Sequence, residues 1–292
     1  MSEKRGYKNL LVPIRHPNDV NRIAEFAETI MNRGTINFLT VVKEDEFSKM
    51  QSDWRKSTKI IGKYKDKITS KRIRVKPKIR YSNSIWRGIL DQAEEEDSDL
   101  IVMGWGRKIT FRSLNQTPIE RVFANSKRDV VAFKNRTGSV NNIQKILFPI
   151  GYKDYDYSKR LALTSQIIKS TGADCVLTHI LTENETEEDA KEILQKPKEF
   201  MLDLGVDCET KIMEHQKIPD ALIEESQNYD LLVLGPTKEY VFSRYLFGWM
   251  TDEIVNNSEC SAMILKEGEQ KWKAWLRGTL DAFKKELKDL FK

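Results

Sequence analysis

Apolar residues along the chain fall into short continuous runs, separated by polar stretches in which apolar positions recur every three or four residues. Two runs share one pattern, an acidic residue, four apolar residues and a glycine, at 99–104 and again at 230–235. A continuous apolar run predicts a strand buried on both faces, as in a parallel sheet. Because the glycine permits a sharp turn where open α/β sheets bind ligands, the pattern predicts one α/β unit written twice.

The other runs predict the same order of elements in each half. The expected strands are 10–14, 36–42, 72–81, 99–104 and 129–133, then 146–150, 175–180, 208–214, 230–235 and 262–265. Helices are expected between them, including a basic one over 47–67, with Ser84 as an N-cap and Gly34 as a C-cap. Pro77 places the third strand at a sheet edge. Alternating strands and helices predict an α/β fold of two tandem five-stranded parallel sheets with helices on both faces, in flavodoxin-type layering.

The polar connector 135–142 marks the boundary between the halves. We expect a first domain over 1–136, a linker over 137–143, a second domain over 144–267 and a C-terminal amphipathic helix over 268–292. The sequence has no apolar run of ~18 residues and no apolar signal region after Met1, which predicts a cytoplasmic protein. Cys175, Cys208 and Cys260 form no Cys-x-x-Cys pair, which favours buried, reduced thiols.

The net charge of +5 is unevenly distributed. The segment 55–80 holds twelve Lys or Arg and one acid, whereas 183–209 holds ten acids and three lysines. One interpretation is two solvated faces. The alternative is that the first half faces something anionic, which would be a membrane surface, an acidic protein or nucleic acid.

The proline-containing first strands, 11–14 and 147–150, the two strands that end in glycine, and Asn-Ser before each last strand form one combination. It resembles the universal stress protein family over about 8–134 and 144–266. The resemblance implies an adenine-nucleotide-hydrolase-like sheet in each half. It also implies pairing through the last strands, so that the two domains form a pseudo-dimer, with a homodimer as a further expectation. Residues 103–106 resemble universal-stress domains attached to amino-acid transporters.

In the nucleotide-binding branch of that family, the loop after strand four reads Gly, two residues, Gly, nine residues, Gly, then Ser or Thr. Glycines let backbone N–H groups approach phosphates, and the hydroxyl caps a helix whose positive end faces them. Neither half keeps the pattern. The first half has Gly104, Gly106 and Thr117, and the second has Gly235, Lys238 and Gly248.

The family's adenine-side acid is replaced by Arg15 in the first half and by Gly151 in the second. Arg107 or Lys238 would offset lost amides with charge. Val41 and Ile180, in the second strands, complete the candidate cleft residues. Three alternatives stay open: binding of ATP or AMP, decayed clefts that only pack, and a different anionic ligand.

No cluster with metal-ligand spacing and no nucleophile–histidine–acid arrangement is recognisable, so we expect no enzyme. His179 lies within an apolar run, which favours a hydrogen-bonded buried histidine over a catalyst.

The last 22 residues carry an apolar stripe opposite a lysine-rich face, which is typical of an amphipathic helix. The expected contact residues are Trp272, Trp275, Leu276, Leu280, Phe283 and Leu287. Three partners fit this stripe: the chain's own domains, a second copy or another protein's helix, and a membrane interface.

Two functional hypotheses follow from the sequence. The first is a non-catalytic stress-response sensor or regulator with at most degenerate adenine-nucleotide binding. The alternative is an interaction module with vestigial clefts, attached by its C-terminal helix to a transporter or to the inner face of the plasma membrane. Nucleic acid ranks low, since 55–80 has little aromatic interleaving beyond Tyr64 within it and Trp54 just before it.

Overall fold

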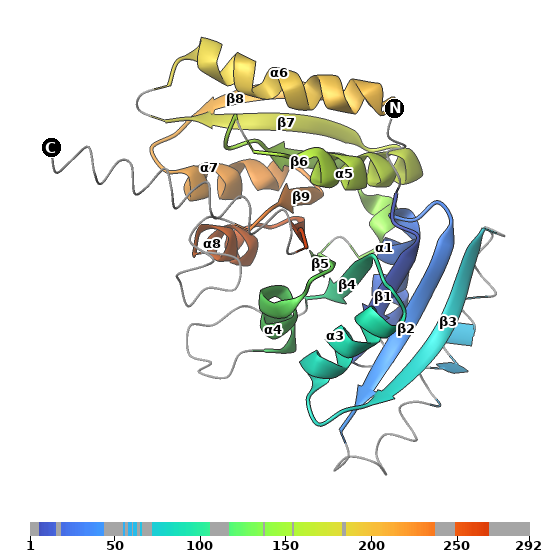
Figure 1. The fold of residues 1–292 in the computed structure, drawn as a ribbon. Helices are drawn as coiled ribbons and strands as arrows, with labels where there is room; N and C mark the ends of the chain where they lie inside the picture. Colours follow the sequence, from blue (N-terminus) through green and yellow to red (C-terminus); the bar gives the residue numbers. More distant parts are fainter. Residues whose placement is uncertain are drawn as a thin grey trace, which may run out of the picture.

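The computed structural model describes residues 6–15, 19–43, 55, 58–59, 61–62, 65, 72–105, 117–136, 138–153, 155–182, 185–236 and 249–268. The strands form a ten-stranded sheet in the order β3-β2-β1-β4-β5-β10-β9-β6-β7-β8 (Figure 1). They are β1 Asn9–Pro13, β2 Gly34–Val42, β3 Ile73–Tyr81, β4 Leu100–Gly104, β5 Asp129–Lys134, β6 Lys145–Pro149, β7 Asp174–Leu181, β8 Glu209–Glu214, β9 Leu231–Leu234 and β10 Ser261–Lys266. The α-helices are α1 Asp19–Thr29, α3 Ile85–Glu95, α4 Pro118–Asn125, α5 Ser158–Thr171, α6 Glu187–Asp203, α7 Ile218–Glu225 and α8 Trp249–Asn257, and two 3-10 turns are η2 Val140–Asn142 and η3 Ser226–Asn228.

Within each half all neighbouring strands are parallel, which confirms the predicted five-stranded parallel units. The two last strands, β5 and β10, pair antiparallel, with Ala262 opposite Lys134 and Lys266 opposite Val130. The halves are therefore joined edge to edge, through the strands that the family resemblance indicated.

Helices cover both faces of the sheet. One hydrophobic cluster joins the sheet to α1, α5 and α6, and a second joins it to α3, α4, α7 and α8. Along β5, Val131 and Phe133 belong to the first cluster whereas Val130 and Ala132 belong to the second. This alternation buries both faces of the strand, which is why its sequence is a continuous apolar run.

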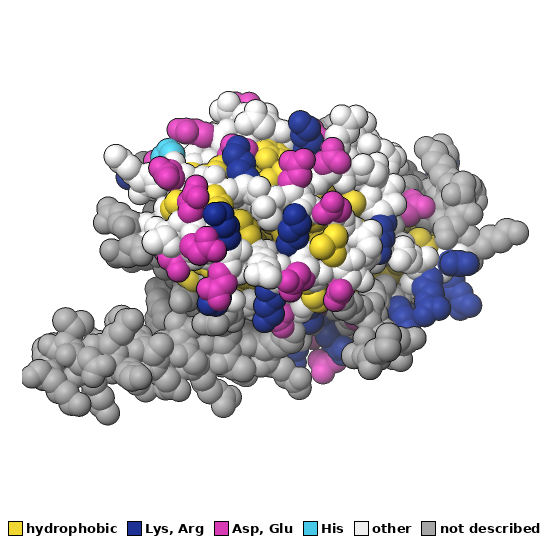
Figure 2. Space-filling model, turned by 90° about the horizontal axis from the view of Figure 1, so that it is seen from above, with side chains coloured by type: hydrophobic (Ala, Val, Ile, Leu, Met, Phe, Trp, Pro, Cys, Tyr) yellow, Lys and Arg dark blue, Asp and Glu magenta, His cyan; other side chains and the backbone are white. Residues whose placement is uncertain are grey.

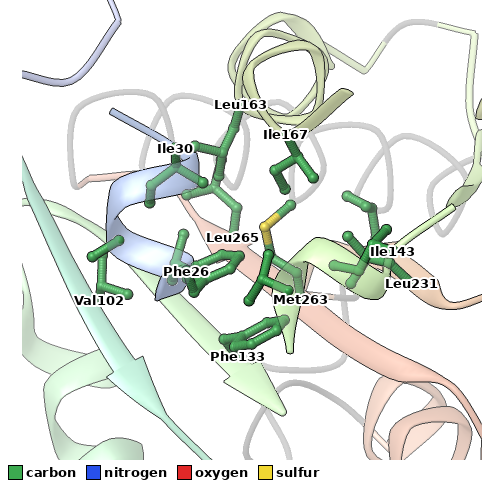
Figure 3. Close-up of a cluster of buried hydrophobic side chains, with 14 of the residues drawn as sticks. Phe26, Ile30, Val102, Phe133, Ile143, Leu163, Ile167, Leu231, Met263 and Leu265 are labelled. Carbon is green, nitrogen blue, oxygen red and sulfur yellow. The ribbon is translucent and has the colours of Figure 1, made fainter. Parts of the chain in front are cut away.

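The core continues across the junction of the halves. The Phe26 ring of α1 stacks on Phe133 of β5 with centroids 4.0 Å apart. Figure 3 shows this pair beside Met263 and Leu265 of β10, with Leu163 of α5 on the far side. The hydrophobic cluster on the α1–α5 side is therefore continuous across the two halves.

The acidic residue before each glycine-ended strand fastens the start of the half's first strand. Asp99 accepts hydrogen bonds from the N–H of Lys8 (2.7 Å) and of Asn9 (3.1 Å). Asp230 accepts from Gln144 (2.9 Å) and Lys145 (3.0 Å). The repeated acid is therefore structural, because it satisfies backbone N–H groups at the amino edge of the sheet.

Two predicted caps differ in the structure. Helix α1 ends at Thr29, and Gly34 instead opens β2 with φ 138°, where an added Cβ would lie 2.0 Å from the carbonyl oxygen of Lys8. The glycine is needed for that close strand approach rather than as a helix cap. Ser84 does occupy the N-cap position of α3, but its side chain makes no cap hydrogen bond.

The segment predicted to link the halves is well packed, since Val140 and Ile143 are fully buried. Within the predicted basic helix, the described residues 55, 58–59, 61–62 and 65 are helical, and Ile61 is buried against the α1 face of the sheet. The predicted C-terminal helix lies outside the described residues, apart from Gly268.

Candidate ligand clefts

The candidate residues of the first half lie at one edge of the sheet. Arg15 is exposed just after β1, Val41 is half-buried near the end of β2, and Gly104 ends β4. Because β2, β1 and β4 are adjacent and parallel, their carboxyl ends meet where the strand order reverses, the usual ligand position in open α/β sheets. In the second half, β7, β6 and β9 bring Ile180, Gly151 and Gly235 to the equivalent edge.

In the first half, the strand-four glycine faces an apolar side chain from α1. An added Cβ on Gly104 would lie 3.8 Å from Cδ1 of Ile23, an ordinary contact distance, and Gly104 itself is exposed. Val41 packs towards α3, where an added Cβ on Gly88 would lie 2.7 Å from its Cγ1. Gly104 is therefore exposed, and the described atom nearest to an added Cβ is apolar.

Thr117 is the N-cap of α4, and the carboxylate of Glu120 from the same helix lies at the helix start. The Thr117 hydroxyl accepts from the N–H of Glu120 at 3.5 Å, while the Glu120 carboxylate accepts a short hydrogen bond from the N–H of Thr117. This capping box satisfies two N–H groups that a phosphate would use. A phosphate at the start of α4 must therefore displace or approach a carboxylate, which opposes binding.

In the second half, a guanidinium fills the space beside the equivalent glycine, Gly235. An added Cβ on Gly235 would lie 2.7 Å from both Cζ and Nη1 of Arg160, which comes from the first turn of α5. The Arg160 residue is 7% exposed, and its Cζ lies 4.9 Å from the Tyr157 ring, 5.0 Å from Tyr155 and 5.7 Å from Phe148. We call these four side chains the arginine cage.

The cage holds a cation that has no carboxylate partner among the described residues. Among the described residues Arg160 forms no ion pair, and its Nε is buried with no hydrogen-bond partner. The aromatic faces stabilise the guanidinium instead, each by about 0.5–2 kcal/mol. Burial raises the pKa of Tyr155 and of Tyr157 although Arg160 opposes this, so both hydroxyls stay neutral.

The loop after β6 also turns onto the cage. The Tyr157 hydroxyl accepts from the N–H of Gly151 at 3.0 Å and of Tyr152 at 2.8 Å. On the opposite side, the Thr251 hydroxyl of α8 donates to the carbonyl of Gly235 at 3.2 Å. The groups around Gly151 and Gly235 are therefore engaged within the chain.

His179 lies below this loop and is hydrogen-bonded at both nitrogens, as predicted for a buried histidine. Its Nδ1 is 2.7 Å from the carbonyl oxygen of Ile150, and its Nε2 is 3.2 Å from Oε2 of Glu185. Burial opposes the charge of Glu185, but hydrogen bonds from Thr182 and His179 lower its pKa overall. Both ring nitrogens are thus committed to fixing the loop.

Sequence reasoning missed Arg160, Tyr155, Tyr157 and Glu120. Superimposing the repeats finds the first: Phe26 and Ile30 of α1 correspond to Leu163 and Ile167 of α5 in the shared core (Figure 3). The same offset aligns Ile23 with Arg160. Of the remaining candidates, Gly106, Arg107, Lys238, Gly248 and the six C-terminal contact residues lie outside the described residues. Ile180 is buried in the core on the α7–α8 face.

Within the described residues, no three His, Cys, Asp or Glu side chains gather as a metal site. No helix in that part of the chain is long and apolar enough to cross a bilayer.

Comparison with known proteins identifies relatives of both halves. The model of the universal stress protein family matches residues 6–134 and 143–266. The Na⁺/H⁺ antiporter NhaS5 of Synechocystis sp. is 22% identical over 264 residues, which cover 87% of this chain and 38% of the antiporter. The chain thus spans about two fifths of the antiporter's length.

Two solved structures resemble the whole tandem chain. A universal stress protein from Archaeoglobus fulgidus matches with a TM-score of 0.63 and 16% identity, over 89% of this chain and 97% of that one. The cytoplasmic domain of a prokaryotic cation chloride cotransporter matches with a TM-score of 0.59 and 14% identity, over 89% and 96%. At these identities the likeness establishes the fold.

Proposed function

Because the chain belongs to the universal stress protein family, we propose that it is a non-catalytic regulatory module that acts with a membrane cation transporter, on its cytoplasmic side. The observation that carries this proposal is that the similarity to the antiporter runs through both halves, over 87% of the chain. The cotransporter domain has the same tandem fold over a similar share of the chain. Both relatives therefore match the two halves of this chain together, as the Archaeoglobus fulgidus protein also does.

The clefts support a regulatory role over a catalytic one. In the second half the arginine cage and the Tyr157 hydroxyl occupy the space and the N–H groups that a ligand would use. In the first half the Glu120 carboxylate occupies the start of α4. The side chains of Tyr157 and Glu120 are hydrogen-bonded within the chain and not available to a ligand. The proposed interaction with a transporter therefore uses the surface of the module.

A second candidate is a nucleotide-responsive sensor that uses the first half alone. It is favoured by Gly104, which is exposed and open, and by Thr117, which keeps the capping hydroxyl. Isothermal titration with ATP and with AMP tests it. Saturable binding at micromolar concentration would favour the sensor, and heat signals that do not saturate at millimolar concentration would favour the transporter module.

Cross-linking in native membranes tests the transporter proposal. The full chain, carrying a photoreactive group at exposed positions of both halves, is expressed in its source organism and irradiated, and cross-linked peptides are identified by mass spectrometry. We expect cross-links to the cytoplasmic segments of a cation antiporter or cotransporter. Cross-links confined to soluble proteins would contradict the proposal.

A further inference from the structure

One edge of the ten-stranded sheet carries cations that have no acidic partner among the residues that the structure describes. The edge strand β3 presents four basic side chains on the face that α3 covers in part. Two of them are neutralised by α3: Lys78 lies 2.5 Å from Glu96, and Arg80 lies 2.5 Å from Glu95. Nearer the start of the strand, Arg74 and Lys76 are exposed and form no ion pair with any described residue.

Further cations lie around the same edge. Ile61 and Val75 both belong to the hydrophobic cluster on the α1 side of the sheet, which is the side of β3 opposite Arg74. The exposed cations there without an ion pair among described residues are Arg55, Lys59 and Lys65. We call these three with Arg74 and Lys76 the basic edge. Both faces of one sheet edge are therefore positively charged.

The opposite end of the sheet has the opposite charge. On the other edge strand, β8, Glu209 and Glu214 are exposed, whereas Lys211 is paired with Glu225 at 2.7 Å. Figure 2, which looks down on α6, shows acidic side chains interspersed with Lys and Arg over that face, and a separate group of Lys and Arg at the β3 end. The molecule is polarised along its sheet, which orients it in the field of an anionic surface.

We propose that the basic edge docks on the anionic phospholipid headgroups of a bilayer, with β8 directed away from it; this rests on the proposed function at a membrane transporter. The exposed described residues of this edge, Arg74, Lys76 and Pro77 among them, offer charge, and Pro77 interrupts the hydrogen-bonding potential of β3, so the edge fits a diffuse anionic surface better than an added strand. Each basic residue near such a surface contributes about 1 kcal/mol. Tyr81 is the one exposed aromatic among the described residues of β3, which gives single-stranded nucleic acid little to stack on.

Vesicle co-sedimentation of the full chain tests the docking. The probes are vesicles of phosphatidylcholine alone and of phosphatidylcholine with phosphatidylglycerol. We expect binding to the anionic vesicles that weakens with added salt, and R74E/K76E should weaken it by about tenfold or more. The matched control K169E/K196E makes the same change in net charge on exposed residues of α5 and α6 and should bind like the wild type. Circular dichroism verifies that both variants fold.

Equal binding by R74E/K76E and the wild type would overturn the proposal, as would wild-type binding that does not require phosphatidylglycerol. Fluorescence polarisation with a labelled RNA oligonucleotide runs in parallel. Loss of RNA binding by R74E/K76E with unchanged vesicle binding would assign the basic edge to nucleic acid and overturn the lipid proposal. The vesicles contain no transporter, so a failure here leaves the cross-linking result untouched.

Discussion

The guanidinium of Arg160 fills the space that a side chain on Gly235 would need, with Cζ and Nη1 2.7 Å from the position of an added Cβ. In the other half the equivalent pair is Ile23 and Gly104, and the distance there is 3.8 Å. The two glycines are alike in sequence, yet Gly235 accommodates a buried cation whereas Gly104 is exposed beside an apolar side chain. The halves have therefore diverged at their clefts while keeping one scaffold.

Substituting the two glycines separates these roles. We expect Gly235→Ala to lower the free energy of unfolding by about 1–2 kcal/mol, because the guanidinium must leave its aromatic contacts. Gly104→Ala, the matched control, should change it by less than about 0.5 kcal/mol, since surface substitutions away from special features usually do. Urea unfolding of the full chain measures both.

The same pair gives a double-mutant cycle. In Arg160→Ile, which installs the residue used by the other half, Gly235→Ala should cost less than it does in the wild type, because the clashing group is gone. Additive effects of the two substitutions would show that Arg160 does not constrain Gly235.

The helix caps predict a graded effect on stability. Thr117→Ala removes the acceptor for the N–H of Glu120 and should cost about 1 kcal/mol. Ser84→Ala is the control, because Ser84 occupies an N-cap position without a side-chain cap bond, and its cost should be clearly smaller. Thermal unfolding of both variants checks the order; a larger loss for Ser84→Ala would contradict the assigned capping.

Glu120 predicts how the first cleft treats phosphate. Glu120→Gln keeps a capping-box residue but removes the negative charge at the start of α4, so ATP affinity should rise. Glu94→Gln removes an exposed acid from α3 and serves as the charge-matched control. Isothermal titration with ATP measures the affinity of both variants. Unchanged ATP affinity in Glu120→Gln would mean that this carboxylate does not limit phosphate binding.

Two buried lysines tie the halves together. Lys134 of β5 donates to the carbonyl of Val255 at 2.9 Å, and Lys266 of β10 donates to that of Ser126 at 2.8 Å. Each ammonium thus meets the carboxyl end of the other half's last helix, which favours a cation. Lys266→Met should lower the free energy of unfolding by about 1–3 kcal/mol, because the buried carbonyl of Ser126 loses this hydrogen-bond donor.

Lys145→Met, at an exposed position of β6, is the control for Lys266→Met and should be nearly neutral. Denaturant unfolding followed by fluorescence and by circular dichroism compares them. Equal costs for the two substitutions would show that the bond across the junction does not contribute.

The thiols predict a pH dependence of stability. Burial raises the pKa of Cys260 to about 11, above the value near 8.5 of an unfolded thiol. The folded state then holds the proton more tightly, so this contribution is complete below about pH 8.5 and is lost as the pH rises towards 11. Between pH 8 and pH 10 the wild type should lose roughly 2 kcal/mol more than Cys260→Ala. Parallel losses in urea unfolding would contradict the shift.

Most of the fold was predictable because its signals are local. The apolar runs identified the strands, and Pro77 identified the β3 edge. Gly34 was assigned wrongly, since a glycine after a helix predicts a cap, whereas here its need comes from the Lys8 carbonyl of a neighbouring strand. Ser84 shows the same limit: the sequence places it at the helix start but does not reveal where its hydroxyl points.

The clefts were less predictable because their chemistry depends on distant residues. Arg160 follows Ser158 and Lys159 in a polar first turn, a pattern that normally indicates a solvent-exposed side chain. Only the aromatic rings around Arg160 make its burial favourable. Comparing the repeats would have set Arg160 against Ile23 and exposed the difference. The sequence places Glu120 at the capping-box position of α4. Its opposition to phosphate binding follows only from the hydrogen bond that its carboxylate accepts from the N–H of Thr117.

Transport in everted membrane vesicles tests the proposed function most directly. Vesicles from a strain that lacks the gene are energised, and the collapse of the pH gradient on adding Na⁺ or K⁺ is followed with and without the purified full chain. We expect the chain to change the rate of cation-driven collapse of the pH gradient. Identical rates for Na⁺, K⁺ and chloride-coupled transport, with the folded chain in excess, would contradict it.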